Sequence, residues 1–206
     1  MLLIRSYFPN LTLSQLDHFR AMLDILPALN QEVNVVSRKD IGSLEERHVL
    51  HSLSIAKKFV FHPGCTVIDA GTGGGFPGIP LAICFPETRF ILVDSIGKKI
   101  KLVAELADRL QLKNVIPVRS RMEELTIRAD FVVSRAVSHF SRLHRWTDPL
   151  IRSGHSSNLP NGLISLKGGD LHEELQPFSD RIEIFPISQW FSEPFFSSKM
   201  IVYLKK

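Results

Sequence analysis

Cysteine is scarce in this sequence: Cys65 and Cys84 are the only two among 206 residues. One pair cannot form the disulfide framework of a small secreted fold, and the spacing matches no metal-binding motif. No apolar run approaches the roughly 20 residues of a membrane-spanning helix. The start, MLLIRSYFPN, lacks the layout of a secretory leader. We therefore expect a cytoplasmic protein without membrane association, in which both cysteines are small buried apolar residues.

Marks of a hydrolase or of a metal centre are also missing. No G-x-S-x-G nucleophile elbow occurs in the chain. His48 and His51 are close in sequence, but no cysteine or carboxylate completes a metal-ligand set beside them. We expect no metal site.

The chain carries little net charge, +4, and 44% of its residues are hydrophobic, as in an ordinary globular domain. The basic residues gather in short clusters: SRKD, ERH, AKK and GKKIK. Such clusters can converge on a phosphate-binding surface. They can equally be solvated helix faces, and charge alone favours that simpler interpretation.

The N-terminal part has a helical pattern. Apolar residues recur every three or four positions over residues 12–30, with Thr12 as the expected N-cap, and Pro27 should end or kink this helix. A second helix is expected over residues 43–60, where SLEE resembles a capping box.

The remainder alternates short β-branched runs with helical stretches, which predicts an α/β fold with a mostly parallel sheet. The last two strands have no helix of comparable length between them, so an antiparallel edge is expected. We predict an N-terminal helical extension over residues 1–62 and a Rossmann-like core over residues 63–206.

The segment VIDAGTGGGFPGIP follows the first predicted strand, at the sheet edge where ligands bind. Read from Gly73, it matches the dinucleotide pattern G-x-G-x-x-G. Read from Asp69, DAGTG matches the D-x-G-x-G pattern of S-adenosylmethionine enzymes. Asp94, which ends the second strand, suits either ligand because both present a ribose diol.

Charge separates the two interpretations. A pyrophosphate prefers a helix N-terminus without a nearby anion. S-adenosylmethionine carries a sulfonium and an ammonium group, so the acid Asp69 beside the loop would favour it. Pro80 also lies where a dinucleotide-binding helix would run uninterrupted. These residues favour the sulfonium ligand.

Three further segments lie at the ends of predicted strands. In SRMEEL, Met122 could pack on an adenine ring while Glu123 accepts a hydrogen bond from its amino group. Arg135 in SRAV could clamp a carboxylate or phosphate, or form a structural ion pair. Lys167 in SLKGG ends the fifth strand at the same edge.

Several motifs occur together and in order: ISRKDI (here VSRKDI), ERHVLHSL, DAGTGGGFPGIPLAI, DSIGKKIKLV, SRMEE, SRAV and LKGG. In these segments the chain resembles the 16S ribosomal RNA guanine-N7 methyltransferase family, also called glucose-inhibited division protein B. The resemblance extends from about residue 15 to the C-terminus. It departs in the extension: many members have NLT where this chain has NVV, and an aspartate at the position of His51.

The resemblance implies a class I S-adenosylmethionine-dependent methyltransferase fold. Family cofactor positions correspond to Gly71, Phe76, Met122, Glu123 and Arg135. To these we add Asp69, Gly73 and Asp94 from the chemistry of the loop. Family residues that contact RNA correspond to Arg38, Arg47, His48, Lys98 and Lys167.

The implied reaction transfers a methyl group from S-adenosylmethionine to guanine N7 in 16S rRNA of the small ribosomal subunit, by a monomer. N7 has a free lone pair and no proton, so we expect no catalytic acid or base, and Arg135 only as a positioning group. The alternatives are a methyltransferase for another RNA or a small molecule, a nicotinamide (NAD) oxidoreductase, and a non-catalytic ribosome-binding factor.

Overall fold

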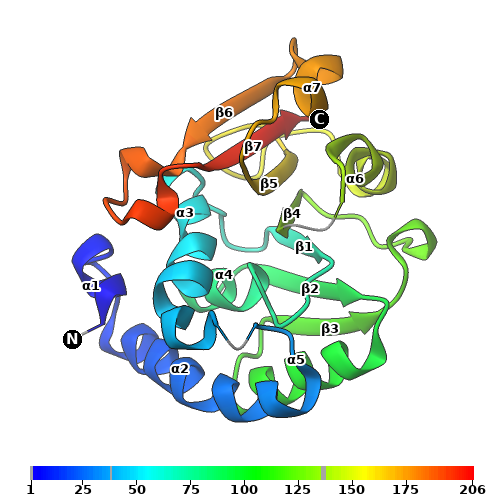
Figure 1. The fold of residues 1–206 in the computed structure, drawn as a ribbon. Coiled ribbons are helices and arrows are strands. Elements are labelled where there is room, and N and C mark those ends of the chain that lie inside the picture. Colours follow the sequence, from blue (N-terminus) through cyan, green and yellow to red (C-terminus); the bar gives the residue numbers. More distant parts are fainter. Residues whose placement is uncertain (1, 38, 136–137) are drawn as a thin grey trace.

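A single mixed sheet of seven strands organises the protein. The computed structural model describes residues 2–37, 39–135 and 138–206. The strand order is β3-β2-β1-β4-β5-β7-β6 (Figure 1). The strands are β1 (Thr66–Ala70), β2 (Arg89–Asp94), β3 (Val115–Arg119), β4 (Phe131–Arg135), β5 (Gly162–Gly168), β6 (Ile182–Pro186) and β7 (Lys199–Lys205).

The sheet confirms the predicted Rossmann-like arrangement. Strands β1 to β5 pair in parallel, while β7 runs antiparallel to both β5 and β6. The reversed strand therefore lies one place in from the edge, with β6 outside it. Because β7 is reversed, its first residue lies at the same sheet edge as the carboxyl ends of the parallel strands.

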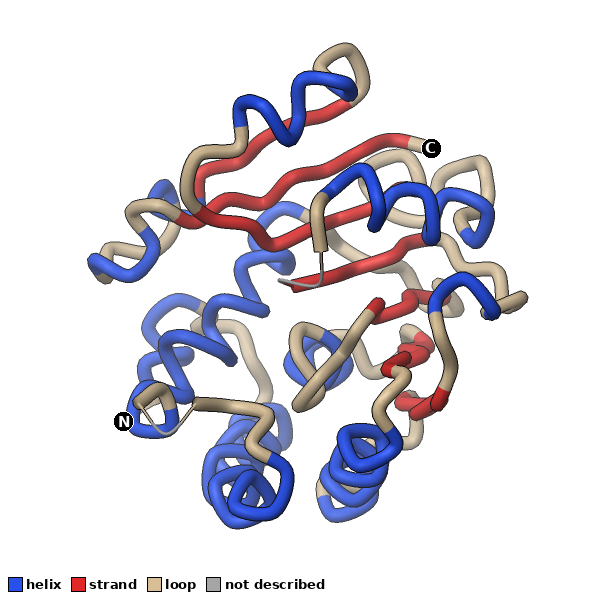
Figure 2. The backbone as a smooth tube through the Cα atoms, turned by 45° about the vertical axis from the view of Figure 1, so that its right-hand side comes forward, coloured by secondary structure: helices blue, strands red, loops and turns tan. Residues whose placement is uncertain are grey.

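Helices cover both faces of the sheet (Figure 2). One face carries α2 (Leu13–Val33), α3 (His51–Lys58), α4 (Gly78–Cys84) and α5 (Gly97–Arg109), and α1 (Leu3–Tyr7) packs near them. The other carries α6 (Phe140–Thr147) and α7 (His172–Leu175). Short helical turns complete the fold: η1 (Ile41–Ser43), η2 (Glu45–Leu50), η3 (Met122–Glu124), η4 (Asp148–Leu150), η5 (Gln176–Phe178), η6 (Ile187–Gln189) and η7 (Pro194–Phe196).

The N-terminal helices share one hydrophobic core with the sheet. Phe19 and Leu26 of α2 belong to the same buried cluster as Phe90 of β2 and Phe131 of β4. Apolar burial of this size stabilises both parts together. The domain boundary at residue 62 therefore stays a prediction. The two segments on either side of it bury their apolar faces against each other.

The first helix begins as predicted and ends later. The Thr12 hydroxyl accepts a hydrogen bond from the Gln15 N–H, and the Gln15 side chain accepts one from the Thr12 N–H, which completes a capping box. Pro27 does not end the helix, which continues to Val33. The helix continues because Leu26, Leu29 and Asn30 on either side of the proline are buried.

The second predicted helix is broken into three types of turn. A 3₁₀ turn, η1, is followed by the π-helix η2 and only then by α3. The predicted capping box at Ser43 is wrong: no side chain caps η1 or η2. Glu45 instead accepts a hydrogen bond from the Ile4 N–H of α1, 3.0 Å away, so this carboxylate fixes the N-terminal segment. π-Helical turns occur often at functional sites.

One buried side chain closes the turn after α2. The Asn30 amide donates to the Val36 carbonyl and accepts from the Val36 N–H, both at 2.8 Å. Asn34 between them has φ of +52°, a left-handed conformation that asparagine tolerates. The Asn30 side chain therefore satisfies two backbone groups that the turn would otherwise bury unpaired.

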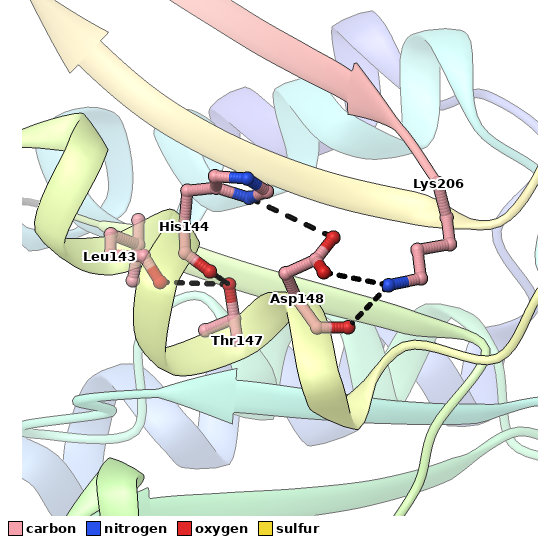
Figure 3. A network of polar contacts seen from close by, with 5 residues as sticks. All are labelled: Leu143, His144, Thr147, Asp148 and Lys206. Atoms are coloured by element: carbon pink, nitrogen blue, oxygen red, sulfur yellow. Dashed lines mark hydrogen bonds and ion pairs between the residues drawn. The ribbon is translucent and has the colours of Figure 1, made fainter.

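The end of the sheet is tied to α6 (Figure 3). Lys206, just after β7, donates from Nζ to the carbonyl oxygen and to Oδ2 of Asp148, both at 2.8 Å. His144 lies 3.9 Å from the other carboxylate oxygen of Asp148, and Thr147 donates to the Leu143 carbonyl. These contacts fix the C-terminal end of α6 against the sheet.

We expect Asn30→Ala to lower the free energy of unfolding by about 2–4 kcal/mol, because two buried backbone groups would lose their partners. Gln31→Ala, at an exposed neighbour on the same helix, is the control and should change it by less than about 0.5 kcal/mol. Urea unfolding of both variants measures this, and equal stabilities would show that Asn30 contributes little.

Candidate active site

A cleft of about 1020 Å³ opens at the carboxyl edge of the parallel strands. Its lining comes from the glycine loop after β1, from the ends of β2, β4 and β5, from η2 and η3, and from the start of β7. Seven of the eight predicted cofactor residues line it: Gly71, Gly73, Phe76, Asp94, Met122, Glu123 and Arg135. The sheet topology thus brings together residues that are far apart in sequence, as the parallel arrangement predicted.

The eighth residue, Asp69, lies beneath the glycine loop and not in the cleft. Its Oδ2 accepts hydrogen bonds from the Thr72 hydroxyl at 2.6 Å and from the Gly78 N–H at 2.8 Å. A Cβ on Gly78 would lie 2.7 Å from that oxygen, so only glycine fits there. The role of Asp69 as a direct cofactor ligand stays a prediction, whereas its hydrogen bonds show how it holds the loop closed.

Burial dominates the electrostatics of Asp69. The side chain is wholly buried, and its Oδ1 has no partner among the described residues. Burial raises the pKa of this carboxyl to about 7, against the opposing effect of the hydrogen bonds from Thr72 and Gly78 and of the Arg135 charge. The carboxyl is therefore close to half ionised at neutral pH.

The glycine loop needs its glycines for conformation. Gly71, Gly73 and Gly75 have φ of +69°, +58° and +93°, values that other residues adopt at a cost. A Cβ on Gly73 would meet nothing nearer than the Gly71 carbonyl at 4.0 Å. Because Gly73 also lines the cleft, such a Cβ would enter space left for a ligand.

Asp94, at the end of the neighbouring strand β2, holds the glycine loop by a hydrogen bond. Its Oδ2 accepts from the Gly73 N–H at 3.2 Å, and its Oδ1 accepts from the Ile96 N–H at 2.9 Å. Lys99 of α5 lies 3.7 Å away and partly balances the charge. The carboxylate is thus fixed at the cleft wall, where it could accept from a ribose hydroxyl. Beyond it, Met122 is buried and Glu123 is exposed on η3.

Arg135 at the end of β4 joins the core to the N-terminal extension. Its Nη2 lies 2.9 Å from His48 Nδ1, and its Nη1 donates to the Arg47 carbonyl at 3.3 Å. The guanidinium also lies 4.9 Å from the centre of the Phe76 ring, a cation–π contact. Burial lowers the pKa of Arg135 to about 10, so it remains charged. The π-helix η2, the glycine loop and β4 therefore meet at the Arg135 side chain.

The predicted RNA-contacting residues differ in whether their charge is free or already paired within the protein. Arg38 lies outside the described residues. Arg47 pairs with Asp40 at 2.9 Å, and Lys167 pairs with Glu174 at 2.6 Å. Burial and the Arg135 charge lower the pKa of His48 to about 4, so this ring is neutral at pH 7.

Lys98 differs from the other candidates. It is exposed on α5, outside the residues that line the cleft, and no ion pair involves it within the described part of the chain. Its ammonium group is therefore free to meet a polyanion.

Among the cleft residues that sequence reasoning missed are Trp146, Phe195 and Lys199. The Lys199 ammonium lies 5.0 Å from the Phe195 ring centre. Trp146 comes from α6. No motif marks Phe195 or Lys199, and only the reversal of β7 explains why they reach this edge. His51, at a departure from the family pattern, is buried against Phe195 with 5.6 Å between ring centres.

The described residues contain neither a membrane-spanning helix nor a metal-ligand cluster. Among residues 2–37, 39–135 and 138–206, no helix is long and apolar enough to cross a membrane. Over the same ranges, no three histidine, cysteine, aspartate or glutamate side chains form a group that could hold a metal ion.

Solved structures share the fold at low sequence identity. An S-adenosylmethionine-dependent O-methyltransferase from Thermotoga maritima superposes with a TM-score of 0.60 and 16% identity, over 81% of this chain and 69% of that one. A further S-adenosylmethionine-dependent methyltransferase, from Aquifex aeolicus, gives a TM-score of 0.58 and 17% identity, over 82% of this chain and 98% of that one. The fold is therefore that of class I methyltransferases.

Sequence relatives are much more similar. A protein of Bacteroides thetaiotaomicron is 50% identical over 203 residues, covering 98% of each chain. One of Flavobacterium johnsoniae is 49% identical over 201 residues, covering 98% of this chain and 96% of that one. Both are named ribosomal RNA small subunit methyltransferase G. The GidB family model, described as rRNA small subunit methyltransferase G, matches residues 15–192, and the chain belongs to this family.

Proposed function

We propose that this protein transfers the methyl group of S-adenosylmethionine to N7 of a specific guanine in 16S rRNA of the small ribosomal subunit. The supporting observation is a single cleft in which the glycine loop is flanked by two acids, Asp69 below it and Asp94 beside it. The names of the sequence relatives support rRNA as the substrate. We place the reaction in the cytoplasm.

The residues of the cleft fit this cofactor in chemistry and in position. When bound, S-adenosylmethionine supplies an electrophilic methyl group on a sulfonium. Asp94 would accept from the ribose hydroxyls, and Gly71 and Gly73 leave room for the ligand against the backbone. Met122 would pack on the adenine, and Glu123 would accept from its amino group. Asp69, below the loop, supplies negative charge close to a cation.

The proposed reaction needs no group for proton removal. Guanine N7 attacks through its lone pair, so the protein has to align N7 with the methyl carbon and the sulfur. Asp69 is buried under the loop, and His48 already accepts at Nδ1 from Arg135. Positioning by Arg135 and its neighbours is therefore the proposed contribution of the protein.

The other functions are separable by experiment. Methylation of another RNA or of a small molecule would use the same cofactor site. A nicotinamide oxidoreductase fits less well, because the buried Asp69 would oppose a pyrophosphate on the loop. A non-catalytic ribosome-binding factor would not need the residues of the cleft that fit the cofactor.

The direct test uses small subunits from a strain that lacks this enzyme, incubated with the protein and labelled S-adenosylmethionine. Borohydride–aniline cleavage and primer extension then map 7-methylguanosine. We expect one new stop at one guanine of 16S rRNA. Cofactor binding without any stop would contradict the proposed substrate while leaving the cofactor site in place.

We predict that Gly73→Val abolishes S-adenosylmethionine binding, because its side chain would enter the cleft. The left-handed φ adds a folding cost of about 1–3 kcal/mol. Gly64→Val is the matched control, since Gly64 has φ of +82° with open space around it and does not line the cleft. Calorimetry should show loss of binding in the first variant only, and retained binding by Gly73→Val would refute the placement of the loop.

The affinity for S-adenosylmethionine should rise between pH 6 and pH 8. With a pKa of about 7, Asp69 ionises over this range, and its ionised form attracts the cationic ligand. The gain is at most about tenfold, the ratio of the ionised fractions at pH 8 and pH 6. Asp69→Asn keeps an oxygen for Thr72 and Gly78 and should remove the part of the pH dependence due to this residue. Equal pH profiles for both proteins would exclude Asp69 as its source.

We expect Lys98→Ala to reduce the salt dependence of binding to the small subunit, by roughly 0.7–0.9 in the slope of log K against log salt for one lost phosphate contact. Lys113→Ala, exposed at the opposite end of the strands, is the control. Filter binding at several salt concentrations measures both slopes. An unchanged slope in Lys98→Ala would show that Lys98 makes no phosphate contact and is only a solvated surface residue.

A further inference from the structure

The contact between Arg135 and His48 determines which ring nitrogen of His48 carries a proton. A guanidinium has only hydrogen-bond donors. Its Nη2 lies 2.9 Å from His48 Nδ1, so Nδ1 has to be the acceptor and carries a lone pair. In a neutral ring the proton is then on Nε2. Arg135 thereby fixes the tautomer of His48, and Nε2–H is a donor.

The ring is also fixed in place. His48 belongs to the π-helix η2, whose Arg47 carbonyl accepts a second hydrogen bond from Arg135. The His48 ring packs on Phe76 of the glycine loop, with 5.2 Å between ring centres and 59° between the planes. His48 lines the cleft, and no hydrogen bond joins its Nε2 to another of the described residues. The donor is therefore held beside the loop and is open to a ligand.

We propose that His48 positions the target guanine by donating a hydrogen bond from Nε2–H to guanine O6. This inference rests on the proposed function, and it concerns the same cleft. Guanine carries two acceptors on one edge, N7 and O6. When N7 faces the methyl group its lone pair is used, and O6 is the acceptor next to it. A donor at O6 therefore aligns the base without competing for N7.

The neutral state of the ring suits this role. Methylation at N7 makes the base cationic, so a charged donor at O6 would repel the product. His48 is neutral at pH 7, because burial and the Arg135 charge disfavour its protonation. Arg135 already donates to His48 and to the Arg47 carbonyl. Adenine would place an amino group against Nε2–H, donor against donor, so the same contact selects guanine.

Two variants of similar polarity separate the donor from the rest of the ring. In His48→Asn the amide oxygen can replace Nδ1 as the partner of Arg135, but the side chain is too short to replace Nε2–H. In His48→Gln the amide nitrogen can reach the position of Nε2. We expect kcat/KM for methylation of small subunits to fall about tenfold in His48→Asn and to stay within about threefold in His48→Gln.

Two controls show whether the variants remain folded and loaded. Thermal unfolding and the Kd for S-adenosylmethionine should be similar in the two variants, because both lose the ring that packs on Phe76. Equal loss of kcat/KM in His48→Asn and His48→Gln, with cofactor binding retained, would overturn the donor role.

A substrate analogue tests the contact with O6 itself. Small subunits are reconstituted with 16S rRNA that carries 2-aminopurine, which lacks O6, in place of the mapped guanine. The wild type should lose about tenfold in kcat/KM on this substrate, while His48→Asn should lose nothing further, because the two changes remove one interaction. An equal loss in both proteins would overturn the inference. Failure of the wild type to methylate unmodified subunits would instead count against the proposed function.

Nitrogen-15 NMR of the whole protein reports the tautomer directly. We expect a neutral His48 ring with the proton on Nε2 at pH 7. A ring protonated at Nδ1, or doubly protonated, would overturn the first step of the inference.

Discussion

The hydrogen bonds of Asp69 are the constraint on which the cleft depends. One carboxylate oxygen accepts from Thr72 at the start of the glycine loop and from Gly78 at its end. These two contacts bend the chain back on itself between β1 and α4, and the close fit around Gly78 leaves no room for a side chain. The loop conformation depends on this buried acid, and Asp94 adds a contact to the Gly73 N–H.

Arg135 performs a similar role for the N-terminal extension. Without it, η2 would lie over the sheet edge with no polar contact to β4. With it, the Arg47 carbonyl, the His48 ring and the Phe76 ring gather round one guanidinium. The extension thus supplies part of the cleft wall, and its residues belong to the site as much as those of the sheet.

The sequence predicts this fold well because its signals are local. Apolar periodicity and the glycine loop locate the strands and helices, and parallel topology then brings the strand ends together. What it cannot predict depends on packing between distant segments. The D-x-G-x-G pattern places Asp69 near the ligand but does not show that the side chain points under the loop. The motif ERH suggests a basic surface, yet His48 is neutral because it is buried beside the charge of Arg135, a residue far away in sequence. Lys199 carries no motif, and only strand reversal brings it to the cleft.

The turn after α2 lies against the glycine loop. Gly74 has no Cβ, and one placed there would come within 2.7 Å of a Val35 methyl group. The two positions therefore share a fixed volume, although they belong to segments on either side of the predicted boundary. Any side chain gained at position 74 requires a smaller residue at position 35. Among related proteins, these two positions should covary in size, which would record this packing in the evolutionary history of the family.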